Sequence, residues 1–248
     1  RQTTPGFAAV TREVEIFRDV RIKLLANTWL YVSTTGNDTT GDGSASAPFA
    51  TVQKAWDTYV TKYDINGYEA GIWLSDGTYD MKLLAVGRIV GQTGPIVIYG
   101  SSLVKWTYTP QDWSNMIWAI GSFIKLTGTM EITRGNPVDY NSFSTGGWTI
   151  AAQSFAHVVV EGITFGYSLT GHMLSSYNSF IALTSNYGIS GGAGWTNGNG
   201  NWPGYHMYAA QGATISTSVP VTAAIFNDIS MNWTPTTNSW FTFSGYNA

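Results

Sequence analysis

The chain has 248 residues, enough for one domain with a sizeable core, and its lack of cysteine excludes a disulfide framework, a thiol nucleophile and thiolate metal ligands. Only 11% of residues are charged and the net charge is −3, so the basic footprint of a nucleic-acid-binding protein is missing and we expect no nucleic acid partner. The 15% of aromatic residues and the 28 glycines favour a β-rich protein with many turns and sugar-like partners, and the absence of a long apolar run argues against membrane insertion.

Residues 1–28 predict a charged lead-in segment. Between residues 14 and 24 apolar and charged side chains alternate, mostly at the two-residue period of a strand. A solvated strand pair and an anchor that docks on a larger assembly are both compatible with this pattern. We place the start of the main domain at residue 29.

A strand, a loop and a helix are predicted next. Trp29–Ser33 is expected to be a short strand, and the loop from Gly36 to Gly43 is rich in Gly, Asn and Asp, which favour tight turns. A calcium site in this loop is the alternative, but the bidentate Glu of an EF-hand loop is missing. Pro48–Tyr63 is the clearest helix, beginning at Pro48 or Thr51. Its apolar face contains Phe49, Val52, Ala55, Trp56 and Tyr59.

These first elements carry a resemblance. The stretch Tyr31-Val-Ser-Thr-Thr-Gly-Asn-Asp-Thr-Thr-Gly-Asp-Gly43, which continues to Trp56, and Gly71-Ile-Trp-Leu-Ser-Asp-Gly-Thr-Tyr79 resemble the opening of a right-handed parallel β-helix of the pectate-lyase-like type. This opening is common in bacteriophage tail spikes and tail fibres. It implies an all-β solenoid over residues 29–248, with the helix at 48–63 capping the first coil.

The resemblance also implies a function. It indicates a phage virion component of the tail-spike or tail-fibre kind that recognises a glycan on the host surface. Its partners would be the host surface polysaccharide, other virion proteins and, in a homotrimer, two further copies of the chain. A polysaccharide depolymerase, either glycoside hydrolase or lyase, and a purely structural decoration protein such as a head fibre remain alternatives.

A recurring phrase supports the solenoid. Four segments of similar pattern place Ser122, Ser154, Ser179 and Ala213 at matching positions. A small residue that recurs at the same place, just before a run of alternating apolar residues, is typical of stacked coils. We therefore predict that these four residues stack along one line, and that Phe123, Phe155 and Phe180, each next in sequence, share one side.

The catalytic candidates are few. Glycosidases need two carboxylates about 5–9.5 Å apart. Glu131 and Glu161 each precede an Ile-Thr segment, so they are the pair most compatible with stacking one coil apart; two solvated surface acids are the alternative. His172 and His206 open equivalent phrases, but a zinc site needs a third ligand. We predict no metal and no cofactor, and favour a protein without enzymatic activity.

The segment Gly191–Gly204 is the candidate recognition loop. It is rich in Gly and Asn, contains two tryptophans and has few core-forming residues. Trp195, Trp202 and the adjacent Tyr205 are predicted to bind the glycan, since aromatic side chains combine a large apolar face with a polar group. Packing of these rings against a neighbouring subunit is the alternative.

Overall fold

The computed structural model describes residues 21–109, 114–134, 147–168, 171–185, 187–190, 194–197, 200–203, 205–217 and 240–243, and at 189, 194–197, 200–203, 205–206 and 240–243 only the backbone. The described part contains one helix and is otherwise built from strands in mostly parallel sheets, so the β-rich class predicted from the sequence is confirmed. In this part, no helix has the length and apolar character needed to cross a membrane. Most of the predicted lead-in, residues 1–20, lies outside the described residues.

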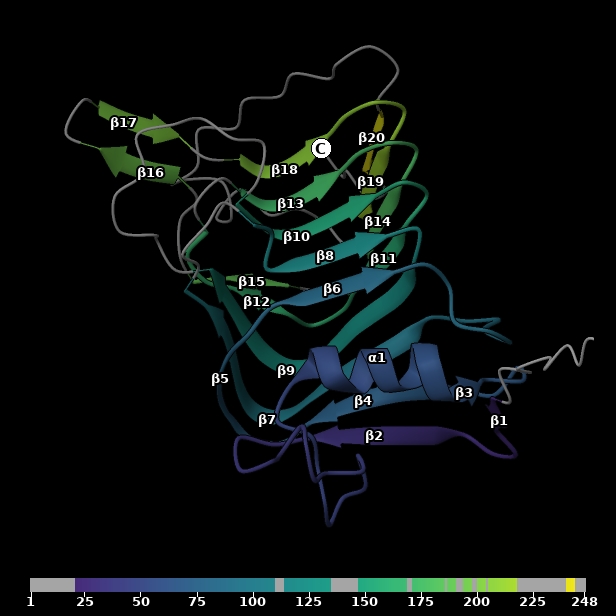
Figure 1. The fold of residues 1–248 in the computed structure, drawn as a ribbon. Coiled ribbons are helices and arrows are strands. Elements are labelled where there is room, and N and C mark those ends of the chain that lie inside the picture. The colour runs from purple at the N-terminus through teal and green to yellow at the C-terminus, as the bar shows by residue number, and fades with distance from the viewer. Residues whose placement is uncertain are drawn as a thin grey trace, which may run out of the picture.

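Two parallel sheets form the body of the molecule (Figure 1). The large sheet has the order β2-β4-β7-β9-β11-β14-β19-β20, and the small sheet has the order β18-β13-β10-β8-β6. Three short strands extend this sheet: β5 pairs with the second half of β7, β12 pairs with the second half of β9, and β15 pairs with β12. The strands of the large sheet are β2 (Thr28–Val32), β4 (Ala70–Leu74), β7 (Ile96–Tyr108), β9 (Phe123–Arg134), β11 (His157–Val160), β14 (Phe180–Leu183), β19 (Thr214–Thr217) and β20 (Trp240–Phe243), with β5 (Gly77–Asp80), β12 (Thr164–Phe165) and β15 (Gly188–Ile189) beside them. Those of the small sheet are β6 (Leu83–Val86), β8 (Ile117–Ile120), β10 (Trp148–Gln153), β13 (Gly171–Ser175) and β18 (Tyr205–Ala209). The remaining strands are β1 (Ile22–Lys23) and β3 (Tyr63–Asp64), which form a parallel pair, and β16 (Gly194–Asn197) and β17 (Gly200–Pro203).

The chain passes alternately between the two sheets. From β8 it runs to β9, then to β10 and β11, and later to β13 and β14, and each strand pairs in parallel with its equivalent one passage earlier. Ile117 of β8 is in register with Ile150 of β10, which is in register with Met173 of β13. The same inward positions are therefore filled by apolar residues in successive passages.

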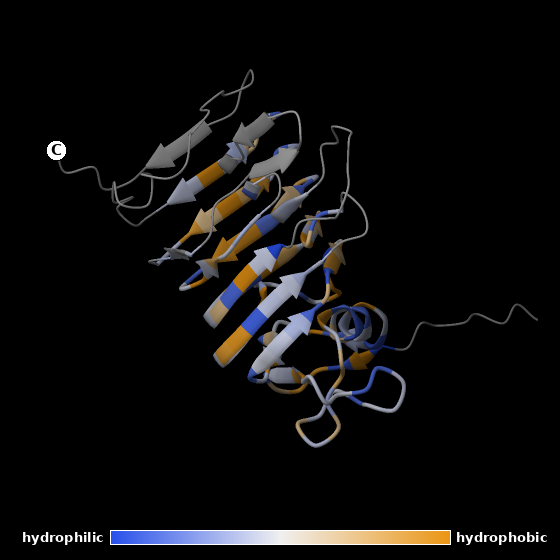
Figure 2. Ribbon diagram, turned by 90° about the vertical axis from the view of Figure 1, so that its left-hand side faces the viewer, coloured by the Kyte–Doolittle hydropathy of each residue, from blue (hydrophilic) through white to orange (hydrophobic). Residues whose placement is uncertain are grey.

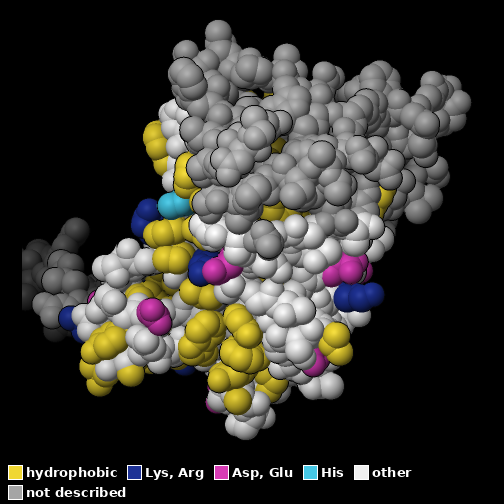
Figure 3. Space-filling model, turned by 180° about the vertical axis from the view of Figure 1, so that it is seen from behind, with side chains coloured by type: hydrophobic (Ala, Val, Ile, Leu, Met, Phe, Trp, Pro, Cys, Tyr) yellow, Lys and Arg dark blue, Asp and Glu magenta, His cyan; other side chains and the backbone are white. Residues whose placement is uncertain are grey.

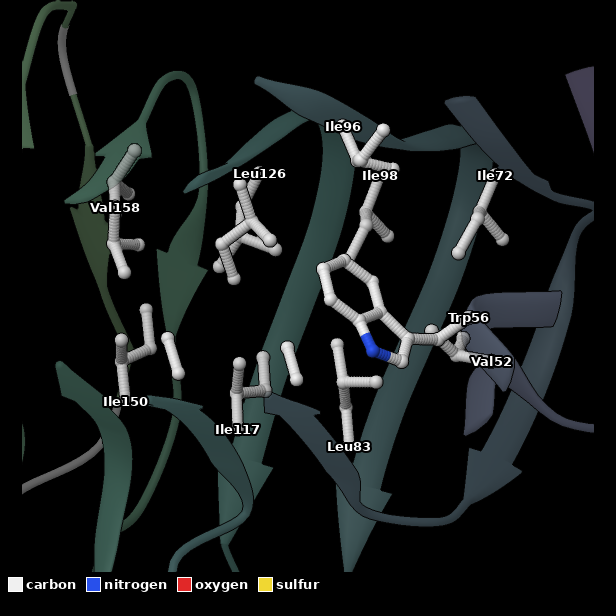
Figure 4. Packing of buried hydrophobic residues seen from close by; sticks show 14 of the residues in the cluster. Val52, Trp56, Ile72, Leu83, Ile96, Ile98, Ile117, Leu126, Ile150 and Val158 are labelled. Carbon is white, nitrogen blue, oxygen red and sulfur yellow. The ribbon is translucent and has the colours of Figure 1, made fainter. Parts of the chain in front are cut away.

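The core lies between the sheets. Ile117 and Ile150 of the small sheet lie opposite Leu126 and Val158 of the large sheet, and all four side chains are fully buried (Figure 4). Apolar segments recur along the stack of strands (Figure 2). Because parallel strands repeat the same register, one inward apolar position per passage is enough to extend the core along the whole stack.

The helix α1 (Val52–Lys62) covers the N-terminal end of this core. Val52, Trp56 and Tyr59 are buried, and the Trp56 indole points into the interior between Leu83 and Ile98 (Figure 4). The predicted apolar face is thus confirmed, and of the two predicted starts Thr51 is confirmed and Pro48 is wrong. Thr51 is the N-cap, since its hydroxyl accepts the Lys54 N–H, and Phe49 instead forms a bridge with Val32 of β2.

Both open sheet edges at this end have hydrogen-bonding partners. On β6, the Leu84 N–H donates to Oε1 of Gln53 at 2.7 Å, and Nε2 of Gln53 donates to the Leu84 carbonyl at 3.2 Å. On β2, the Tyr31 N–H donates to the Gly43 carbonyl and the Tyr31 carbonyl accepts the Phe49 N–H. The helix and the loop therefore supply the pairing that a further strand would otherwise give.

The predicted repeat is confirmed for three of its four small residues. The register aligns Phe123, His157, Phe180 and Thr214. The preceding residues Ser122, Ala156, Ser179 and Ala213 therefore occupy one line, and all four are buried. The placement of Ser154 and Phe155 on these lines is wrong for two reasons. Ile117 pairs with Ile150 rather than with Thr149, which displaces β10 by one residue from the predicted alignment, and the turn that follows β10 is one residue longer than the turn that follows β8.

Ser154 and Phe155 form the corner of their passage instead. Both have positive φ angles, 54° and 65°, and Phe155 is 72% exposed. The register from Ala152, Ser175 and Ala209 places Asn178 (φ 58°) and Gly212 (φ 76°) at the equivalent corner positions. Asn and Gly are tolerant of this conformation, whereas it is unfavourable for a bulky aromatic residue.

Candidate functional site

Four aromatic side chains form a group on the outer face of the large sheet, which we call the aromatic platform: Trp29 and Tyr31 of β2, Trp73 of β4 and Tyr99 of β7. The register places Tyr31, Trp73 and Tyr99 side by side on neighbouring strands. The ring centroids of Trp73 and Tyr99 are 4.5 Å apart, and those of Tyr31 and Trp73 are 6.4 Å apart. All four side chains are only partly buried, so they form an accessible apolar surface. From behind, hydrophobic side chains are seen to gather on this face (Figure 3).

Two tryptophans of the platform meet at a right angle. The planes of Trp29 and Trp73 are inclined by 82° with centroids 6.1 Å apart. The six-membered ring of Trp29 occupies the space above Gly71, where a β-carbon would approach it to 2.3 Å. Glycine at position 71 therefore allows the Trp29 ring to lie over β4, next to the Trp73 ring.

The sequence analysis missed these four residues as a site, although a signal was present. Trp29 and Tyr31 are two residues apart in a predicted strand, and so lie on one face. Trp73 follows in the Gly71–Tyr79 motif. Only the strand register, which joins β2 to β4 and β4 to β7, brings them together.

A second row of side chains lies further along the same face, where the strands begin; we call it the edge row. Phe123 of β9 stacks on His157 of β11, with centroids 4.5 Å apart and planes inclined by 1°. His157 meets Phe180 of β14 edge-on at 4.9 Å. The guanidinium of Arg88 lies 5.1 Å from the centre of the Phe123 ring, a cation–π contact. Partial burial, and secondly the charge of Arg88, lower the pKa of His157.

Between the platform and the edge row, one ion pair occupies the face. Nζ of Lys125 contacts Oε2 of Glu161, and the Thr127 hydroxyl donates to the same carboxylate at 3.1 Å. The hydrogen bond from Lys125 is the main cause that lowers the pKa of Glu161, and the Thr127 hydrogen bond adds to it.

Glu131 and Glu161 do not occupy matching positions. Glu131 is in register with Thr164 and accepts a hydrogen bond from the Thr133 hydroxyl at 3.3 Å. Glu161 lies beside Thr127, four residues before Glu131 in β9, with the Gly128 bend (φ 94°) between. The predicted stacking of the two carboxylates is therefore wrong, because the Ile-Thr segments that follow them are not equivalent in the fold.

The segment predicted to bind the glycan contains an antiparallel hairpin, β16–β17. Its register places Trp195 directly opposite Trp202, and Tyr205 begins β18, where it is in register with Gly171. The side chains of Trp195, Trp202 and Tyr205 lie outside the described residues. The hairpin was not expected for this segment, although Gly and Asn, which favour two-residue hairpin turns, surround the turn.

The expected alignment of the two histidines is confirmed at the backbone level. His172 lies opposite His206, between the registered pairs Gly171–Tyr205 and Met173–Met207. The His172 ring is buried, and Nε2 lies 2.7 Å from the Gly166 carbonyl. Burial lowers the pKa of His172 to about 4. Within the described residues no group of three His, Asp or Glu side chains is arranged to hold a metal ion.

The loop considered for calcium uses its oxygens for its own backbone. Oδ1 of Asn37 accepts the N–H groups of Thr39 and Thr40. Oδ1 of Asp38 accepts the N–H groups of Ala50 and Thr51, and Oδ2 accepts the Thr51 hydroxyl. These hydrogen bonds attach the loop to the start of α1, which gives the acidic and amide residues a structural role.

Comparison of the chain with models of protein families, with curated proteins and with solved structures finds no match in any of the three.

Proposed function

We propose that this protein is a right-handed parallel β-helix of the phage tail-spike or tail-fibre kind, and that it recognises a glycan on the host surface. The alternation of the chain between two parallel sheets, with one apolar register carried through successive passages, supports the solenoid. The helix α1, which buries Trp56 and pairs the open edge of β6, supports its role as the N-terminal cap.

The aromatic platform is the observation on which the glycan function depends. A pyranose ring has an apolar C–H face and a polar rim of hydroxyl groups. Aromatic rings provide a matching apolar surface, while indole N–H and phenol O–H groups are available for the hydroxyls. Trp29 and Trp73 at a right angle allow one ring to contact the face of a sugar and the other to contact its edge.

The hairpin β16–β17 is the second place at which a glycan contact is proposed. Residues directly opposite in an antiparallel pair belong to one face of the ribbon, so positions 195 and 202 are suited to act together. Tyr205 follows at the start of β18.

Binding without cleavage is favoured over depolymerisation. The acid pair with the best sequence pattern, Glu131 and Glu161, is separated in the fold, and the Glu161 carboxylate is bonded to Lys125 and Thr127. A charged, hydrogen-bonded carboxylate of lowered pKa is unsuited to the general acid role, for which the pKa must be raised.

The test is incubation of the purified chain with host-type capsular polysaccharide, followed by separate measurements of binding and of new reducing or unsaturated ends. We expect retention on immobilised polysaccharide without new ends. Trp73→Ala should weaken retention, whereas Leu103→Ala, at an exposed apolar residue outside the platform, should not. New ends that accumulate with time would establish the depolymerase instead, and absence of binding would favour a decoration protein.

Assembly as a homotrimer in the virion is part of the same proposal. The low charge and the many aromatic side chains of the chain suit burial between copies, since aromatic residues are enriched at interfaces. Sedimentation at micromolar concentration tests this assembly, and a stable monomer would contradict it.

A further inference from the structure

We propose that the edge row, formed by Arg88, Phe123, His157 and Phe180, binds an anionic group carried by a saccharide. This inference rests on the proposed glycan recognition and adds the chemical class of the ligand. The sequence analysis assigned no binding role to these residues.

The edge row is a continuous series of rings in mutual contact that crosses three strands. Phe123 and His157 are parallel and 4.5 Å apart, and Phe180 follows at 4.9 Å. The register of β9, β11 and β14 fixes these three residues in line, so the row is built into the sheet rather than carried on a loop. Its rings are partly exposed, so they offer an apolar surface to the ring of a sugar.

Arg88 supplies a positive charge at one end of the row. Its side chain is exposed, and its guanidinium lies over the Phe123 ring at 5.1 Å. Among the residues that the structure describes, Lys125 and Glu161 form an ion pair in which the two charges compensate each other. The edge row therefore has a cation without a described carboxylate partner, on a chain of net charge −3.

This combination defines the ligand. A guanidinium forms two parallel hydrogen bonds with a carboxylate or a phosphate, and it does so while stacked on an aromatic ring. The rings beside it favour an anion attached to a flat apolar body over a free inorganic ion. An acidic sugar, bearing a carboxylate or joined through phosphate, has both parts.

The experiment uses the full chain and calorimetric titration with oligoglucuronate. The matched probe is the same oligosaccharide with its carboxylates reduced to alcohols. We expect the wild type to bind the charged form at least about tenfold more tightly than the reduced form, since a charge-assisted bidentate contact contributes more than a neutral hydrogen bond. Arg88→Gln should remove this preference. Lys82→Gln, which alters another exposed cation over a ring, that of Tyr108, should preserve it.

The outcomes are distinguishable. Equal affinity of the wild type for the charged and reduced forms would overturn the anionic site and leave the proposed glycan recognition standing. If neither form nor any host polysaccharide bound, the proposed function would also be lost. Competition by oligomeric glycerol phosphate would support the site with phosphate as its anion. A change of oligomeric state in Arg88→Gln, measured by sedimentation, would overturn the proposal because the row would then be an interface between copies.

Discussion

Replacement of Phe155 by Asn should stabilise the protein, although it removes a large apolar side chain. The φ angle of Phe155 is 65°, in the left-handed region, and the equivalent corners of the next two passages hold Asn178 and Gly212. The left-handed conformation costs an ordinary L-residue about 1–2 kcal/mol, and Asn tolerates it better. The ring is 72% exposed, so the loss of its remaining burial should cost less than about 1 kcal/mol.

The net expectation for Phe155→Asn is a gain of about 0.5–1 kcal/mol in the free energy of unfolding. For a chain of this length this corresponds to a rise in Tm of roughly 1–4 °C. Denaturant unfolding followed by circular dichroism measures the first quantity, and calorimetry the second. The backbone bond from the Phe155 N–H to the Tyr177 carbonyl, 3.1 Å long, is retained in the variant.

Phe155→Ala is the matched control. It removes the same ring but lacks the side-chain amide whose local hydrogen bonds let Asn tolerate positive φ, so the backbone strain persists and no gain is expected. A stabilised Phe155→Asn together with an unchanged or weakened Phe155→Ala would identify the backbone as the cause. Loss of more than about 0.5 kcal/mol in Phe155→Asn would refute the reasoning, because the ring would then contribute packing that outweighs the strain.

Three further variants test the N-terminal end and the interior. Trp56→Ala should cost about 3–5 kcal/mol, because the ring is 2% exposed and lies in the core; a loss in the range of surface substitutions would contradict this. Gln53→Ala should cost about 1–2 kcal/mol by removing both bonds to the edge strand at Leu84, and an unchanged denaturation midpoint would show that water replaces them. His172 has a folded pKa of about 4, below the value of about 6.5 in unfolded chains. The contribution of neutral His172 to the free energy of unfolding should therefore be fully present above pH 6.5, and the protein should lose about 3 kcal/mol of stability as the pH falls to 4. His172→Gln should flatten this part of the stability–pH curve, and identical curves for the variant and the wild type would contradict the prediction.

Local patterns in the sequence were sufficient to predict which face of the helix is buried and which strand positions point into the core. Phe49, Val52, Trp56 and Tyr59 are buried as predicted, because an amphipathic period can be read without knowledge of the fold. The sequence left the start of the helix open between Pro48 and Thr51, since the pairing of Phe49 with Val32 of β2, which excludes Pro48, joins residues that are distant in the sequence.

Strand register was the main quantity that local patterns could not supply. The repeated phrase identified successive passages, but a one-residue difference in the register of β10 and one extra residue in the turn after it together moved His157, rather than Phe155, into line with Phe123 and Phe180. The same limitation affected Glu131 and Glu161: Glu131 lies within β9, whereas Glu161 lies between β11 and β12, and Thr164 rather than Glu161 is in register with Glu131. The aromatic platform was missed for this reason too, because its members come from β2, β4 and β7.

The most direct test of glycan recognition is a crystal structure of the full chain soaked with an oligosaccharide from a host capsule that the chain retains. We predict a sugar ring against Trp73 on the outer face of the large sheet, in contact with Trp29 or Tyr99. A sugar bound elsewhere, with the platform covered by a neighbouring copy of the chain that is also present in solution, would contradict the central claim.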